Sequence, residues 1–317
     1  MALQNISMMS FLSSHRSLRK LATRLGSGLL ALSLSVGVAM PSFADDPFRE
    51  GNPYQIGDLT EEAFYAIFRE GNYIEAEQIL QQAEQEEPGE PLVHAMLASM
   101  AYLKGEDHFE EVNRRAALTT QAAQAMLDND PESLRGYLYS AVGVFLEGAY
   151  VLKTQGVAQG TPTALGMLQQ VFSSLDKAEE IAPDDPELNL LKGYMDLMLA
   201  VNLPFSNPDE AITRMSEFGS PSYLAQRGIA IGYRDLEQYD KALIAVDTAI
   251  AEADGNPELY YLKGQVLVRS GNPEASVPWF QQALENAEGR LPERLTMQIR
   301  FEECRAAERG NCGVLRP

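Results

Sequence analysis

The chain has 317 residues, with 25 basic and 45 acidic side chains and a formal net charge of −20. Because a surface this acidic is repelled by nucleic acid and by anionic membranes, we expect neither to be a partner. We attribute most of the acidic residues to solubility, since acidic residues that are spread over many helices rarely form one specific site.

Residues 1–44 have the pattern of an export signal. An apolar core from Leu29 to Met40 is followed by the small-x-small sequence Ser42-Phe43-Ala44, so we expect cleavage after Ala44. The segment before the core is basic and contains Arg16, Arg19, Lys20 and Arg24. A retained membrane anchor is the alternative, but the apolar run is much shorter than the roughly 20 residues that a spanning helix needs.

Removal of this segment would leave 21 basic and 45 acidic residues, a net charge of −24. We expect the periplasm as the destination, with a thylakoid lumen or the cell exterior as alternatives. No later segment is long and apolar enough to span a bilayer, so no stable membrane insertion is expected after cleavage.

Residues 45–57 contain two prolines and two glycines and predict an extended lead-in. Two helix pairs follow, near 58–88 and 91–129. The first is marked by small residues, an aromatic residue and a closing proline at Gly71, Tyr73, Ala76, Ala83 and Pro88. The second carries Leu97-Ala98 and Gly105, and its second helix is long.

A third pair, near 131–183, carries about 21 extra residues around a predicted Gly-rich loop, Thr154 to Thr163. Its first helix is apolar nearly all round, which indicates burial on more than one side. The loop is either a functional insertion or a tolerated surface excursion. A fourth pair, near 186–219, has six extra residues within Val201 to Pro208.

Two copies of a 34-residue unit form the fifth and sixth pairs, near 222–255 and 257–288. The period relates Ala230 to Gly264, Ala242 to Ser276, and Ala249 to Ala283. A fixed period of this size predicts a solenoid of stacked helix pairs, in which small residues let the backbones approach closely.

Residues 291–317 predict a capping helix and a tail. Leu291, Leu295 and Ile299 recur every four residues, which suits a helix that covers the last apolar face. Cys304 and Cys312 are the two cysteines of the chain. Because an exported chain meets an oxidising compartment, we predict a disulfide between them.

The pattern of small residues, aromatic residues and closing prolines resembles that of the tetratricopeptide repeat family. The resemblance implies an all-α fold, a right-handed superhelix of about six helix pairs with a C-terminal capping helix. Lys192 and Lys263 depart from the family pattern, which usually has leucine at these positions before Gly193 and Gly264.

In this family the first helix of each pair lines a concave groove that holds extended peptides or partner helices. Carried over by position, the resemblance implies a partner-binding set rich in tyrosine and arginine, the residue types that anchor interfaces. This set consists of Tyr65, Phe68, Arg69, Tyr102, Arg135, Tyr139, Tyr194, Arg227, Arg234, Tyr261 and Arg269. The arginines would favour a carboxylate, such as a peptide C-terminus. Alternatively, some of the tyrosines pack one repeat against the next.

Catalytic and metal-binding patterns are scarce. His94 lies inside a predicted helix, and His108 lies among the acids of Glu106 to Glu111, which we interpret as a solvated helix start rather than a cation site. No metalloprotease, nucleophile-elbow or phosphate-loop motif occurs, so no enzyme, metal or cofactor is expected.

The sequence therefore favours an exported scaffold or adaptor that binds a protein or peptide partner in its concave groove, for assembly of an envelope or membrane complex. The alternative is a carrier of a small or lipid-like ligand, held near residues 131–163. Because a fold does not assign a function, the first interpretation rests in part on the family resemblance.

Overall fold

The structure is a computed structural model that describes residues 46–49, 51–202 and 208–315. The predicted export signal and its cleavage site lie outside these residues. In the described part the chain is built of helices and connecting turns, as the all-α expectation requires. No helix there combines the length and the apolar character that crossing a membrane demands.

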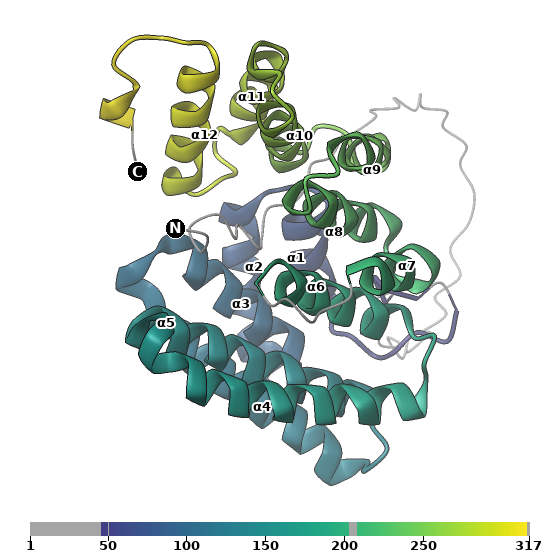
Figure 1. Ribbon diagram of the computed structural model, residues 1–317. Helices are drawn as coiled ribbons and strands as arrows, with labels where there is room; N and C mark the ends of the chain where they lie inside the picture. Colours follow the sequence, from purple (N-terminus) through teal and green to yellow (C-terminus); the bar gives the residue numbers. More distant parts are fainter. Residues whose placement is uncertain (1–45, 50, 203–207, 316–317) are drawn as a thin grey trace, which may run out of the picture.

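The helices follow one another as antiparallel neighbours joined by short turns (Figure 1). Two short 3₁₀ segments, η2 (Glu106–His108) and η3 (Cys312–Leu315), accompany them. The α-helices are α1 (Asp58–Phe68), α2 (Tyr73–Glu86), α3 (Pro91–Lys104), α4 (Phe109–Asn129), α5 (Leu134–Ile181), α6 (Pro186–Asn202), α7 (Pro208–Phe218), α8 (Ser222–Asp235), α9 (Tyr239–Glu252), α10 (Pro257–Arg269), α11 (Pro273–Ala287) and α12 (Glu293–Ala306).

Several helices begin with a proline whose preceding side chain caps the first turn. At α10 the side chain of Asn256 accepts a hydrogen bond from the backbone N–H of Glu258 at 2.8 Å, and Pro257 occupies the first helical position. Glu90 accepts from the N–H of Leu92 at α3 in the same way. These local signals explain why the pairs restart where the sequence places a proline.

The predicted small residues lie where helices cross. Ala230, Ala242, Ala249, Ser276 and Ala283 are fully buried, as the 34-residue period predicts. A Cβ atom at Gly264 would lie 2.5 Å from the ring of Phe280 in α11, so no larger residue fits at the α10–α11 crossing without a shift.

The predicted ten-residue loop from Thr154 to Thr163 is wrong. Apart from Gly156, these residues are helical within α5, and the direction of the chain changes at Gly156, whose φ of 76° is positive. The two halves of α5 then pack against each other as an antiparallel hairpin. They approach closely near the turn, where a Cβ at Gly160 would lie 3.1 Å from the carbonyl oxygen of Val151. One glycine is enough for the reversal, and Pro162 is accommodated in the second half. Most of the extra residues of the fourth pair lie at 203–207, outside the described part.

The solenoid closes on itself, so its first and last pairs are also in contact. The Tyr73 hydroxyl of α2 donates to Glu258 of α10 at 3.0 Å, and the N–H of Ile74 donates to the carbonyl oxygen of Arg290 at 3.2 Å. Figure 1 shows α1 and α2 beneath the C-terminal helices α8 and α10. Buried apolar side chains from Phe48 to Ala306 form one continuous core. The first helices of the pairs contribute many of the side chains in this core.

The C-terminal helix α12 covers the end of the solenoid. Leu291, Leu295 and Ile299 are buried against α11, as their four-residue spacing predicts. The predicted disulfide between Cys304 and Cys312 is present, with the Cα atoms 5.7 Å apart. It ties η3 to the last turns of α12.

Candidate functional site

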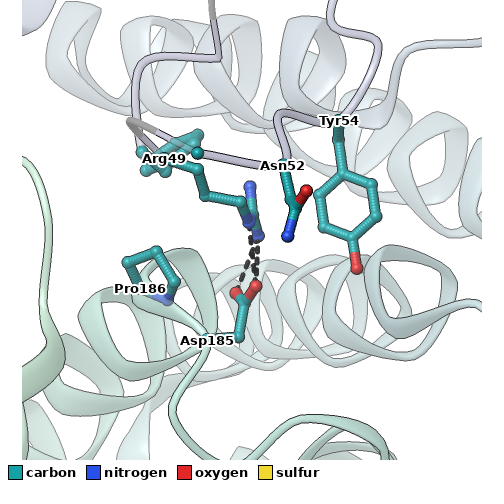
Figure 2. A pocket seen from close by; sticks show the side chains of 7 residues that line it. Arg49, Asn52, Tyr54, Asp185 and Pro186 are labelled. Atoms are coloured by element: carbon teal, nitrogen blue, oxygen red, sulfur yellow. Dashed lines mark hydrogen bonds and ion pairs between the residues drawn. The ribbon is translucent and has the colours of Figure 1, made fainter.

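The lead-in does not extend freely from α1 but folds back onto the start of α6 (Figure 2). The Arg49 guanidinium donates to both carboxylate oxygens of Asp185, from Nε at 2.8 Å and from Nη2 at 2.7 Å. Its Nη2 also donates to Glu187 at 3.0 Å, and its Nη1 to Asp46 at 2.6 Å. Such bidentate, charge-assisted pairing is the strongest form of guanidinium recognition. We call Asp46, Asp185 and Glu187, with the arginine they hold, the Arg49 site.

The lead-in forms a compact loop around this arginine. The buried Asp46 carboxylate accepts hydrogen bonds from the N–H groups of Phe48 and Tyr54, both at 2.9 Å. The Tyr54 ring lies 4.2 Å from the guanidinium carbon, a cation–π contact. Phe48 is 2% exposed and meets the ring of Phe64 in α1 edge to face, at 4.9 Å between centroids. One adjacent pair of side chains, Phe48 and Arg49, thus fixes the segment to two different helix pairs.

A second arginine lies behind the first. Arg135 of α5 donates from Nη1 and Nη2 to the two carboxylate oxygens of Glu90, both at 2.8 Å, and from Nε to Glu187 at 3.1 Å. The Tyr139 hydroxyl donates to Glu187 at 2.6 Å. The resulting network joins the beginnings of α3, α5 and α6, so the carboxylate that meets Arg49 is held in place by residues outside the lead-in.

Ion pairing counteracts the effect of burial on three charged groups of this network. Burial opposes ionisation of Glu187, yet Arg135 and Arg49 hold the pKa of its carboxyl below the ordinary value. Burial raises the pKa of Asp185, an effect that Arg49 offsets in part. Burial would lower the pKa of Arg49, but Glu187 and Asp185 raise it above its ordinary value. The site is therefore a fixed acidic receptor for a guanidinium group.

The closed interior holds a second polar cluster. Tyr73 and Glu258 meet there across the contact between the first and sixth pairs, next to Arg227 of α8. Burial raises the pKa of Glu258 to about 8, although Arg227 and the Tyr73 hydroxyl lower it. The Tyr194 hydroxyl donates to the carbonyl oxygen of Leu224 at 2.7 Å.

The structure divides the predicted partner-binding set by accessibility. Exposed side chains are Arg69 and Arg269, and partly exposed ones are Tyr65, Tyr102 and Tyr194. The buried ones are Phe68, Arg135, Tyr139, Arg227, Arg234 and Tyr261.

The buried members already have partners within the chain. Besides the contacts of Arg135 and Tyr139 given above, Arg234 pairs with Asp235 at 2.8 Å and the Tyr261 hydroxyl donates to Glu302 at 2.7 Å. Removal of either Arg135 or Tyr139 would affect the fold as well as the proposed surface, since it would leave buried carboxylates short of a partner. A role of the whole set in binding stays a prediction.

The residues of the Arg49 site were not singled out from the sequence. A signal for them exists, because Asp185-Pro186-Glu187-Leu188 and Asn256-Pro257-Glu258-Leu259 occupy equivalent positions in the fourth and sixth pairs. In both, the glutamate at the start of the helix points inward and is fully buried. No local pattern, however, places Arg49 opposite the first of them.

Two cavities lie near this part of the fold. One, of about 440 Å³, is lined by Phe48, Arg49, Gly51, Asn52, Tyr54, Asp185 and Pro186 (Figure 2). The other, of about 570 Å³, lies between the end of α5, the start of α6 and α7. Neither is lined by residues 131–163, where the carrier interpretation would place a ligand. Among the described residues, no three His, Cys, Asp or Glu side chains are grouped to hold a metal ion.

Comparisons with known proteins agree with this architecture. Residues 257–289, which span α10 and α11, match the tetratricopeptide repeat model. A comparison with curated proteins gave no match.

Among solved structures, the chain is similar to PilW, a widely conserved type IV pilus biogenesis factor, with 16% identity over 71% of this chain and 89% of that one and a TM-score of 0.48. A tetratricopeptide repeat protein from Parabacteroides merdae ATCC 43184 has 17% identity over 82% and 91%, with a TM-score of 0.46. A human IFIT1 dimer with m7Gppp-AAAA has 16% identity over 76% and 54%, with a TM-score of 0.48.

Each of these TM-scores lies below 0.5, so the likenesses say nothing about a partner or an activity. The repulsion of nucleic acid accordingly stays a prediction from charge. The repeat match at 257–289 and the series of helix pairs that precedes it give the chain an all-α fold of tetratricopeptide-repeat type.

Proposed function

We propose that this protein is an exported adaptor that holds an extended segment of a protein partner against the beginnings of its repeat helices. The observation that carries the proposal is the chain's own lead-in, a non-helical segment seated there by Phe48 and Arg49. A face that already binds an extended segment through one aromatic and one charged side chain has the chemistry of a peptide-recognition surface.

The same proposal includes export, to the periplasm in the first instance, and a role in assembling an envelope complex. Two observations support export: the signal-like pattern of residues 1–44 and the disulfide between Cys304 and Cys312. Disulfides persist in oxidising compartments and are rare where thiols are kept reduced.

We further propose a second contact with the partner near the ends of α1, α3 and α10, made by the accessible members of the predicted set: Arg69 and Arg269 with the partly exposed Tyr65 and Tyr102. Arginine and tyrosine anchor interfaces because they bury large areas and still donate hydrogen bonds. No catalytic role is proposed for any residue.

Affinity capture tests the proposal. The exported chain is used as bait in extract of its source cells, and each captured protein is then purified and titrated against the bait. We expect one protein to bind directly, and binding to weaken by about tenfold with Arg69→Ala plus Arg269→Ala. Arg300→Ala, an exposed arginine on α12 outside the proposed surface, is the control and should bind as the native chain does. If no captured protein binds the purified chain, the adaptor proposal fails.

A further inference from the structure

We propose that Asp185 and Glu187 of the Arg49 site, together with Phe64, form a receptor for a Phe-Arg pair in an extended segment of the partner, and that Phe48 and Arg49 of the lead-in occupy it in cis. The inference rests on the proposed function and names the chemistry of the segment that is bound. It makes the lead-in a competitor that a partner must displace.

Two of the three carboxylates that bind Arg49 are held in place by contacts outside the lead-in. Asp185 caps α6 by accepting from the N–H of Leu188 at 3.0 Å, which fixes its orientation. Glu187 is held by Arg135 and Tyr139 and is fully buried. A guanidinium that enters therefore meets preorganised acceptors, which reduces the entropy lost on binding.

The aromatic half of the receptor is also preformed. The Phe64 ring that receives Phe48 is packed edge to face on Phe68, at 4.7 Å between centroids within α1. Asp185 and Phe64 belong to different helix pairs, so one dipeptide spans both. The requirement for an aromatic residue directly before arginine follows from this placement.

Few side chains of the lead-in hold it against the helix pairs. Residues 51–55 are exposed, and the cavity of about 440 Å³ lies between this stretch and Pro186. Asp46 belongs to the lead-in itself and would leave with it. Release of Phe48 and Arg49 would thus free the two carboxylates at the start of α6.

The charge of the chain favours a partner segment that contains arginine. Comparison of the repeats indicates that this arginine would bind at the fourth helix pair. After signal removal the chain is strongly acidic, so a basic segment is attracted before it docks. At the equivalent position of the sixth pair Asn256 replaces Asp185, and Tyr73 covers Glu258. Two carboxylates that can bind one guanidinium are therefore present at the start of α6 but not at the start of α10.

A tethered occupant acts at an effective concentration on the order of millimolar, so a free peptide should bind the native chain weakly. The test uses a fluorescent peptide with the sequence of residues 46–54 and measures fluorescence anisotropy. We expect the Phe48→Ala, Arg49→Ala chain, which vacates the receptor, to bind this peptide about tenfold or more tightly than the native chain.

Two controls assign such binding to the receptor. Adding Asp185→Asn to the vacated chain should abolish the gain, whereas Asp184→Asn at the exposed neighbouring position should keep it. A peptide with glutamine at the position of Arg49 should bind neither chain. If the vacated chain keeps native circular dichroism and binds no better than the native chain, the proposal is overturned.

Should the vacated chain not fold, hydrogen exchange on the native chain decides. Excess peptide should speed exchange at the N–H groups of Phe48 and Tyr54, which Asp46 protects. Unchanged exchange at saturating peptide also overturns the proposal. Neither assay uses the cellular partner, so failure here leaves the adaptor proposal standing, and failure of affinity capture leaves the receptor standing.

Discussion

Replacement of Arg135 tests how the network behind the Arg49 site supports the fold. Arg135 is 4% exposed and donates to both oxygens of Glu90 and to Glu187. Arg135→Ala would leave Glu90 without its guanidinium partner, while Glu187 would keep Arg49 and Tyr139. Breaking a buried ion pair from one side costs about 3 to 5 kcal/mol, because an uncompensated charge stays buried.

We therefore expect Arg135→Ala to lower the free energy of unfolding by about 4 kcal/mol, a large part of the 5 to 15 kcal/mol typical of folded domains. For a chain of this size the midpoint of thermal unfolding should fall by about 10 °C. Urea unfolding followed by circular dichroism gives the free energy, provided that the transition remains two-state.

Arg69→Ala is the matched control, because it removes the same side chain from an exposed position at the end of α1 and should change stability by about 0.5 kcal/mol or less. Replacing Arg135 by Met together with Glu90→Gln should recover part of the loss, since the pair is then removed from both sides. Equal stability of Arg135→Ala and Arg69→Ala would refute the assignment of Arg135 to a buried supporting network.

Three further predictions concern the helix crossings, the tail and the closed interior. Ala249→Leu should lower stability by about 1 to 3 kcal/mol through overpacking of a fully buried crossing, measured by urea unfolding, and a neutral result would contradict close helix approach there. Reduction of the Cys304–Cys312 disulfide should remove about 2 to 3 kcal/mol at most, and thiol labelling of the unreduced chain should find no free cysteine; two free thiols would disprove the pairing. Burial raises the pKa of Glu258 to about 8, so the native state takes up a proton and stability should fall as pH rises from about 4.5 towards 8, by up to about 1.4 kcal/mol per pH unit. Glu258→Gln should flatten this dependence in thermal unfolding measured across that range, and an unchanged slope would show that other groups cause it.

The parts of the fold that could be predicted from sequence are those that short, periodic patterns determine. Ala242 and Ala249 had to be small because helices cross at a fixed period, and both are buried where expected. The four-residue spacing of Leu291, Leu295 and Ile299 indicates α12, because one helical face needs no information from elsewhere, although the helix itself begins at Glu293, after Leu291. The glycine content around residue 156 predicts a longer loop than the structure has. A single residue with positive φ, Gly156, reverses the chain, and the neighbouring Gly160 lies within the helix.

The candidate site depends instead on contacts between residues far apart in the chain. Arg49 and Asp185 are 136 positions apart, and Tyr73 and Glu258 are 185 apart. Position within a repeat tells which helix face a side chain occupies, but not whether that face is open. This is why the carried-over positions included Arg135 and Tyr261, whose hydrogen-bonding groups are already engaged inside the molecule.

The closed interior also contains buried polar groups that oppose the meeting of the two ends. In the described part of the chain, the Tyr223 hydroxyl, one oxygen of Glu258 and one guanidinium nitrogen of Arg290 are buried without a hydrogen-bond partner in the protein. Each such group costs about 1 to 3 kcal/mol when left unsatisfied, so apolar burial and the Tyr73–Glu258 contact have to offset that cost. The Arg49 site carries no comparable deficit, because each of its carboxylates meets a guanidinium. Of the Tyr73–Glu258 and Arg49–Asp185 contacts, the one made by the lead-in is therefore the better matched chemically, and it is the one from which we infer the chemistry of the proposed partner.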